Sequence, residues 1–219
     1  MSTHSTTSDI AHIRKDYKLA ALEESAVGDD PLAFFTKWFA EAEIAKIDEV
    51  NAMTLATVDS NHKPHARIVL LKGLNDKGLV FYTNYDSAKG KELAANPFAT
   101  VVFFWKELER QVRFEGRIEK VPTAESDEYF HSRPMGSQIG AWASPQSSMI
   151  HDRTIIEENY QTYEQQFKNI GITRPEHWGG YCLFPEKIEF WQGRSNRMHD
   201  RIVFEMQPKH GWKKYRVAP

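Results

Sequence analysis

Five short segments with alternating apolar residues follow one another between residues 52 and 119, and they restrict the fold more than any other feature of the sequence. The spacing predicts strands over 52–58, 66–71, 79–83, 99–105 and 110–119. Polar turn residues at 59–62 and 75–78 separate the first three of them. Connections this short favour antiparallel pairing, because parallel neighbours need crossovers of about a dozen residues or more. We expect the strands to close into a small barrel, since closure removes exposed sheet edges.

Helical and strand-like patterns surround this core. Helical spacing predicts helices over 10–22, 31–47, 87–96, 123–131, 137–143 and 152–169, and alternation predicts further strands over 180–184, 187–192, 201–206 and 212–217. Asp30 followed by Pro31 is typical of a helix N-cap with proline at the first helical position. The fold class is therefore mainly β with flanking helices (α+β). We expect a flexible N-terminal tail over 1–10 and a single domain over 11–219.

Composition excludes several classes of function. Lys and Arg (28) nearly balance Asp and Glu (30) and form no long basic run, which argues against a nucleic-acid partner. No apolar run approaches the roughly 18 residues of a membrane span, and the first ten residues lack the apolar core of a secretion signal. The single cysteine, Cys182, fits a reducing compartment, so we expect a cytoplasmic protein. The nine histidines lack metal-site spacing, so we expect no metal. No Rossmann or P-loop motif is present, so neither a dinucleotide on a Rossmann fold nor a P-loop nucleotide is indicated.

A polar loop between two predicted strands carries an unusual set of side chains. Over 189–201 the chain places three arginines, one histidine and one tryptophan around Gly193. Guanidinium groups bind phosphate through paired hydrogen bonds, and indole offers a flat stacking surface. The loop therefore suits an anionic, aromatic ligand. The alternative is an ordinary solvated hairpin loop.

Cations also occur within or beside apolar strand segments. Arg67 and Lys72 bracket four apolar residues, and strand alternation predicts that they point to opposite faces. Charges in such places are almost never buried unpaired, so each needs an anion. Lys89, Arg133, Arg197 and Arg201 raise the same question. The partners are either Asp and Glu side chains or one or two phosphate-bearing ligands, and no acidic stretch balances all six cations.

Ordered sequence blocks across residues 12–219 resemble the pyridoxamine (pyridoxine) 5'-phosphate oxidases, flavoproteins of vitamin B6 metabolism. The resemblance rests on Arg67-Ile68-Val69-Leu70-Leu71-Lys72, on Arg197-Met198-His199-Asp200-Arg201, on the blocks at 81–84, 108–112, 129–134, 137–142, 146–148 and 189–193, and on the Ala218-Pro219 end. It implies an antiparallel, Greek-key-like split β-barrel that forms a homodimer and binds FMN where the subunits meet. The strand pattern agrees with that fold.

The resemblance also assigns site residues. FMN would contact Arg67, Ile68, Val69, Leu70, Leu71, Lys72, Tyr82, Thr83, Lys89, Gln111, Gln146, Ser147, Trp191 and Arg201. The substrate phosphate would meet Lys72, Tyr129, Arg133 and Ser137. Arg197 and His199 would lie over the reacting carbon as the catalytic residues, and Arg14 and Tyr17 would close over the substrate.

The activity that the resemblance implies is FMN-dependent oxidation of pyridoxamine or pyridoxine 5'-phosphate by dioxygen. The products would be pyridoxal 5'-phosphate and hydrogen peroxide, with ammonia from the amine. One departure from the family pattern is Ala88, which stands where an arginine is common, and it predicts weaker FMN retention. The alternatives are a related split-barrel flavin reductase with another substrate, a flavin- or haem-binding module without turnover, and an oligonucleotide-binding barrel.

Overall fold

The computed structural model describes residue 10 and residues 12–219. The predicted flexible tail over 1–10 therefore lies, apart from Ile10, outside the described residues. Among the residues described, no helix has both the length and the apolar character needed to cross a membrane.

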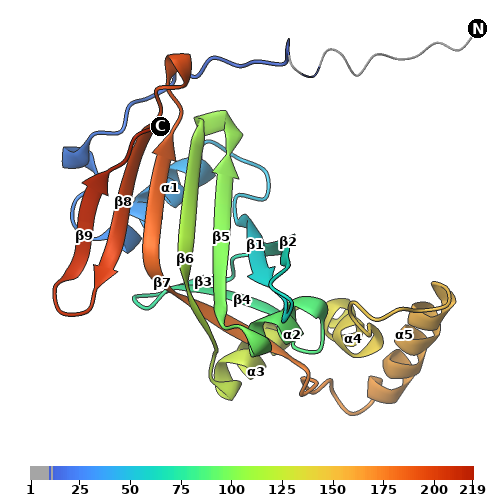
Figure 1. Ribbon diagram of the computed structural model, residues 1–219. Helices are drawn as coiled ribbons and strands as arrows, with labels where there is room; N and C mark the ends of the chain where they lie inside the picture. The colour runs from blue at the N-terminus through green and yellow to red at the C-terminus, as the bar shows by residue number, and fades with distance from the viewer. Residues whose placement is uncertain (1–9, 11) are drawn as a thin grey trace, which may run out of the picture.

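One curled antiparallel sheet of nine strands forms the body of the protein (Figure 1). The strands are β1 (Ala52–Val58), β2 (Pro64–Leu70), β3 (Gly73–Leu74), β4 (Leu79–Asn84), β5 (Phe98–Trp105), β6 (Arg110–Lys120), β7 (Trp178–Gln192), β8 (Asp200–Gln207) and β9 (Gly211–Arg216). The order is β2-β1-β5-β6-β7-β4-β3, with β8 paired to β7 and β9 paired to β8. Every strand pair is antiparallel, which confirms the pairing predicted from the short connections.

The strands predicted over 180–184 and 187–192 are one continuous strand, β7, so the predicted break between them is wrong. The register between β6 and β7 shifts between Glu115 and Gly116, opposite Pro185 and Lys187. An extra residue at such a bulge bends the strand and increases its twist without ending it. β7 can therefore run the whole length of the sheet and pair with β6, β4 and β8.

Helix α1 (Pro31–Ile44) covers one face of the sheet, as expected (Figure 1). The Asp30 carboxylate accepts hydrogen bonds from the N–H groups of Leu32 and Ala33 at 2.9 and 3.1 Å, so the predicted N-cap is confirmed. The aromatic residues of α1 pack into the core: the ring centroids of Phe35 and Phe114 lie 4.9 Å apart, and those of Phe34 and Phe190 lie 4.8 Å apart. A fully buried side chain of this size contributes roughly 1.5–3 kcal/mol.

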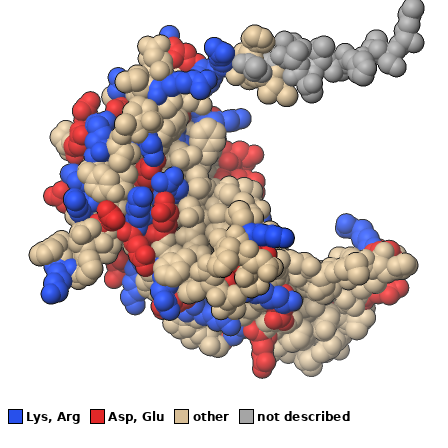
Figure 2. Space-filling model, viewed as in Figure 1, with Lys and Arg blue, Asp and Glu red and all other residues tan. Residues whose placement is uncertain are grey.

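Four further helices lie beside the lower end of the sheet in Figure 1. They are α2 (Ala88–Ala95), α3 (Thr123–Ser132), α4 (Met135–Ala143) and α5 (Thr154–Phe167). α4 and α5 pack against each other and form an arm that projects from the sheet (Figure 1), and the space-filling view in Figure 2 shows the same arm at the lower right. Phe167 is the single buried residue of α5, so most of this helix contributes nothing to the core of its own chain.

The helix predicted over 10–22 is wrong. Residues 13–23 form neither helix nor strand, and the chain crosses the end of the sheet as an extended segment (Figure 1). The N–H groups of Leu19 and Leu22 bond to the carboxylates of Glu109 and Asp200, both at 3.0 Å, instead of to carbonyls of their own segment. Tertiary hydrogen bonds have replaced the local ones that a helix would need.

Candidate functional site

A hollow of about 670 Å³ lies where β2 and β4 meet α2, α3 and α4. Its lining contains most of the residues expected to hold FMN or the substrate phosphate: Arg67, Ile68, Val69, Leu70, Lys72, Tyr82, Thr83, Lys89, Tyr129, Arg133, Ser137 and Gln146. Segments that are far apart in the sequence therefore converge here. Arg67 and Lys72 both face this hollow, contrary to the prediction of opposite faces, because β2 ends at Leu70 and the alternation stops before Lys72.

Arg67 is neutralised within the protein. Its guanidinium lies 2.9 Å from a carboxylate oxygen of Glu92 and also bonds to the Thr57 hydroxyl. Glu92 is buried, and the hydrogen bonds from Thr57 and Arg67 outweigh its burial and keep its pKa below the ordinary value. For Arg67, an acidic side chain is thus the partner, although the guanidinium still borders the hollow.

Lys89 and Lys72 have no carboxylate within ion-pair distance among the described residues. The Lys89 ammonium donates to the Gln146 side-chain oxygen at 3.0 Å and to the Thr83 hydroxyl at 3.3 Å. Burial and the nearby charge of Arg67 lower the pKa of Lys89. Lys89 is half-buried, and because partial desolvation of a cation without a counter-charge is costly, an anion in the hollow would be stabilised by Lys89.

Arg133 and an aromatic stack form one wall of the hollow. The rings of Tyr82 and Tyr129 stack at 3.9 Å, and Trp178 lies nearly parallel to Tyr82 at 5.6 Å. The Arg133 guanidinium lies over Trp178 at 4.5 Å, and its Nη1 is buried without a hydrogen-bond partner among the residues that the structure describes. Burial also lowers the pKa of Arg133. Buried donors are almost always bonded, so an unpaired guanidinium nitrogen at a hollow marks a place for an anionic ligand.

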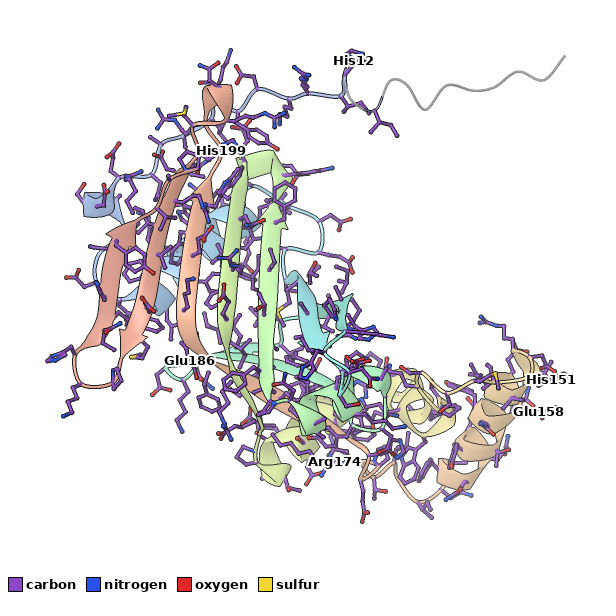
Figure 3. All side chains as sticks on the ribbon, in the orientation of Figure 1. His12, His151, Glu158, Arg174, Glu186 and His199 are labelled. Atoms are coloured by element: carbon purple, nitrogen blue, oxygen red, sulfur yellow. The ribbon has the colours of Figure 1, made fainter. Side chains whose placement is uncertain are left out.

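A second hollow of about 470 Å³ lies at the other end of the sheet. It is bordered by residues 13–17 on one side and by the loop after β7 on the other, and it contains Arg14, Tyr17, Arg197 and His199. Figure 3 places His199 at this end, away from α3 and the α4–α5 arm. The four residues expected to close over the substrate and to act at the reacting carbon are therefore together, but in one chain they lie apart from the first hollow.

The orientation of His199 fixes its protonation. The Arg194 N–H donates to His199 Nδ1 at 3.1 Å, so Nδ1 is unprotonated and the neutral ring carries its proton on Nε2. Burial and the positive charge of Arg197 lower the pKa of His199 below its ordinary value. The loop itself is tightly folded, since Asn196 and Arg197 both have left-handed backbone angles, with φ of 56° and 62°. His199 is thus a neutral hydrogen-bond donor next to a cation.

Three further predicted FMN residues form a row across the sheet. Gln111 on β6 pairs with Trp191 on β7, and Trp191 pairs with Arg201 on β8. Trp191 contacts His199 with ring centroids 4.6 Å apart, so the row joins the second hollow. Glu189 binds Arg201 through two hydrogen bonds of 3.0 and 2.9 Å, an acidic partner like that of Arg67.

Two further predicted residues, Leu71 and Ser147, line neither hollow and do not belong to this row, and the structure adds others that sequence reasoning missed. Leu71 is packed in the hydrophobic core, and Ser147 is exposed beside Gln146 with φ of 68°. The lining of the first hollow also includes Asn84, Pro134, Gly140, Ala141, Ser144 and Trp178. Trp178 had a usable signal, because a tryptophan at a strand start can offer a stacking surface. The small residues of α4 carry no such signal.

The curled antiparallel sheet is that of a split-barrel protein, and the cations and the aromatic wall of its first hollow are chemically suited to a phosphorylated, ring-containing ligand. Residues 40–167 match the family model described as pyridoxamine 5'-phosphate oxidase, and residues 178–219 match the one described as pyridoxine 5'-phosphate oxidase C-terminal dimerisation region. The chain therefore belongs to the pyridoxamine 5'-phosphate oxidase family.

Individual relatives agree over nearly the whole chain. The pyridoxine/pyridoxamine 5'-phosphate oxidase of Leptospira interrogans is 56% identical over 96% of this chain and 98% of its own length. The protein of the same name from Pseudomonas fluorescens is 52% identical over 97% of this chain and 100% of its own. Among solved structures, PhzG from Burkholderia lata, in complex with tetrahydrophenazine-1-carboxylic acid, superposes with a TM-score of 0.86 at 26% identity over 94% of this chain and 100% of its own.

Proposed function

We propose that the protein is an FMN-dependent oxidase that converts pyridoxamine or pyridoxine 5'-phosphate and dioxygen to pyridoxal 5'-phosphate and hydrogen peroxide, releasing ammonia from the amine. The observation that carries the proposal is the buried Nη1 of Arg133, which has no hydrogen-bond partner in the described part of the chain and lies at a hollow walled by stacked aromatic rings. Family membership and the names of the relatives support the same substrate class. Cys182, the single cysteine, is buried, which suits a cytoplasmic protein.

The residues of the first hollow fit FMN. A phosphate needs cationic and hydroxyl donors, and Lys89, Thr83 and Ser87 already form a connected cluster at the start of α2. Residues 67–70 would contact the rest of the cofactor along β2. When bound, the flavin supplies the two-electron acceptor chemistry and passes the electrons on to dioxygen.

The substrate phosphate fits beside it, against the aromatic wall. Lys72 and Arg133 supply charge, Tyr129 supplies a phenolic hydroxyl, and Ser137 at the start of α4 supplies a further donor. Burial raises the pKa of Tyr129, which keeps that hydroxyl protonated and able to donate. These groups would hold a part of the substrate that does not react and thereby fix the reacting carbon, which is an entropic contribution to catalysis.

Arg197 and His199 would act at the reacting carbon. The Arg197 guanidinium has no carboxylate within ion-pair distance among the described residues, so its charge is available to stabilise negative charge that develops on the substrate. His199 would donate a hydrogen bond from Nε2, and its lowered pKa keeps it neutral near pH 7. His199 is therefore assigned as a donor and not as a strong base.

A homodimer would unite the two hollows into complete sites. The sheet face opposite α1 leaves Ile68 64% and Phe104 54% exposed, and Phe104 pairs with Gln111 at the end of the Gln111–Trp191–Arg201 row. Large apolar side chains exposed together on one sheet face are typical of an interface. The dimerisation region matched by residues 178–219 includes β7, β8 and β9. Each complete site would then combine the first hollow of one subunit with the second hollow of its partner.

One experiment tests the activity. The purified protein should have the yellow absorption spectrum of a bound flavin, pyridoxine 5'-phosphate should bleach it without oxygen, and air should restore the colour and produce hydrogen peroxide. Unphosphorylated pyridoxine should bleach it far more slowly, because Lys72 and Arg133 would have no phosphate to bind. A colourless protein, or equal rates with the two vitamers, would contradict the proposal.

A mixing experiment tests the shared site. Arg133→Met and Arg197→Leu each damage a different hollow, and subunits from the two variants would form mixed dimers that contain one intact site. A one-to-one mixture should regain about a quarter of the wild-type activity, because half of the dimers are mixed and half of their sites are intact. If both hollows of one chain formed one site, mixing would restore nothing. Each variant re-associated with itself is the control.

A further inference from the structure

The segment that borders the second hollow has no regular secondary structure. Residues 13–22, here called the strap, form no helix or strand, yet they carry Arg14 and Tyr17 against the loop after β7. In Figure 3 the strap lies along the end of the sheet near His199. Leu22 at its end is buried in the core, but most of the other side chains are exposed, so hydrophobic burial contributes little to holding the part that carries Arg14 and Tyr17. Its position must depend on specific polar contacts.

Glu109 connects the strap to the loop. Its carboxylate is only 7% exposed, accepts a hydrogen bond from the Leu19 N–H at 3.0 Å and lies 3.7 Å from the Lys15 ammonium. Its backbone carbonyl accepts a hydrogen bond from the Gly193 N–H at 2.7 Å. The residue has a left-handed backbone with φ of 55°, which is unfavourable for a residue with a side chain. That conformation lets one residue bind both the strap and the start of the loop.

Asp200 makes the same connection at the other end of the loop. One carboxylate oxygen accepts from the Leu22 N–H and from Arg194, both at 3.0 Å, and the other accepts from Arg216 at 2.7 Å. Although burial opposes ionisation, these donors lower the pKa of Asp200. Arg216 also donates to the Leu22 carbonyl at 2.9 Å. Strap, loop and β9 therefore meet at one carboxylate.

Gly193 provides the surface on which the strap rests. A Cβ at this position would lie 2.7 Å from Cδ2 and 3.0 Å from Cβ of Tyr17, closer than carbon atoms approach without displacement. The Tyr17 ring also contacts Trp191 edge-on at 5.8 Å and His199 at 6.0 Å. Tyr17 can occupy this place only because residue 193 lacks a side chain.

We propose that Glu109 and Asp200 are positioning residues that fasten the strap to the catalytic loop, so that Arg14 and Tyr17 are in place over Arg197 and His199 when the phosphorylated vitamer binds. This inference rests on the proposed function for its catalytic consequence. Neither carboxylate lines the second hollow, so both act through the strap and not on the ligand itself. A charge-assisted bond to a carboxylate is roughly twice as strong as a neutral one, so an amide at either position should weaken the fastening.

The test compares Glu109→Gln and Asp200→Asn with Glu107→Gln in the flavin-loaded, full-length protein. Glu107 lies two residues away with its side chain 50% exposed, so it matches the charge change without touching the strap. Trypsin should cut at Arg14, Lys15 and Lys18 roughly tenfold faster in the first two variants, as followed by the mass of the shortened chain. KM for pyridoxine 5'-phosphate should rise by a similar factor with a smaller change in kcat.

Cleavage at the wild-type rate, or KM values equal to that of Glu107→Gln, would overturn the proposal. If an amide variant does not fold, Glu109→Asp decides the question, because it keeps the negative charge and a left-handed backbone that aspartate tolerates but draws the carboxylate back from the Leu19 N–H. It must show the same faster cleavage and higher KM. A wild-type protein that does not oxidise the vitamer would refute the proposed function but not the fastening, which the cleavage rates would then decide.

Discussion

Replacing Arg133 with methionine should weaken binding of the phosphorylated substrate while leaving the free protein at least as stable as before. In the free protein Nη1 is buried with no partner within residues 12–219, so its removal relieves roughly 1–3 kcal/mol of desolvation cost. The contact with Trp178 at 4.5 Å is lost in exchange, at about 0.5–2 kcal/mol. The two effects nearly cancel. In the complex, however, a charge-assisted bond worth roughly 1.5–3 kcal/mol disappears, which weakens binding by a factor of roughly 10 to 150.

Thermal unfolding of the flavin-loaded protein with the non-reacting analogue 4-deoxypyridoxine 5'-phosphate measures both effects. A ligand at about 100 times its Kd stabilises by about 2.7 kcal/mol, or roughly 5–10 °C for a chain of this size. At the same concentration the Arg133→Met variant should show half of that shift or less, with an unchanged or slightly higher Tm without ligand. Arg153→Met is the matched control, since its side chain is 87% exposed. A full ligand shift in Arg133→Met, or a large fall in its unliganded Tm, would refute the reasoning.

Three further outcomes are expected. Ala88→Arg adds a guanidinium at the first residue of α2 and should tighten FMN binding by roughly 10 to 150-fold, as measured by flavin fluorescence. Ala94→Arg on the same helix is the control and should leave FMN affinity unchanged. Equal FMN affinities of the two variants would contradict the predicted contact between residue 88 and the FMN phosphate. The His199 imidazole should titrate below 6.5 by NMR, and removing the repulsion in Arg197→Leu should raise that midpoint; a wild-type midpoint above 6.5 would be inconsistent with the partial burial of His199 and the nearby charge of Arg197. Since the unfolded chain takes up this proton first, the contribution of neutral His199 to stability is present above about pH 6.5 and is lost as the pH falls through the lower pKa of the folded state. Arg197→Leu should also cut turnover while FMN stays bound, and unchanged turnover would exclude a catalytic role.

The sheet could be predicted because its signals are local. Alternating apolar residues and turn residues follow directly from the sequence, and the Asp30–Pro31 cap likewise needs no distant partner. The continuous β7 was not predicted, because a bulge depends on the register of the neighbouring strand. The helix predicted over 10–22 failed for a similar reason, since the partners of the Leu19 and Leu22 N–H groups lie at residues 109 and 200.

The candidate site, like the fold, could be predicted from the sequence only in part. Cationic residues among apolar ones suggested an anion site, and Lys72, Lys89 and Arg133 do face one hollow. The sequence could not show which cations are already neutralised. Glu92 on α2 reaches Arg67 on β2 only because α2 packs against β1 and β1 pairs with β2. The sequence also could not place Arg197 and Arg133 at opposite ends of the chain's sheet, which is a property of the whole fold.

Strand β7 has a consequence for which changes in length the protein can tolerate. It begins at Trp178 in the aromatic wall and ends at Gln192, one residue past Trp191, about 45 Å further along the strand. One inserted residue would turn every later side chain to the opposite face, which would bring Trp191 into the core and expel Phe190. Extra residues can be accommodated at the turn between β8 and β9, where no such alternation has to be kept. Between 178 and 192, therefore, the residue count is as strongly constrained as the residues themselves.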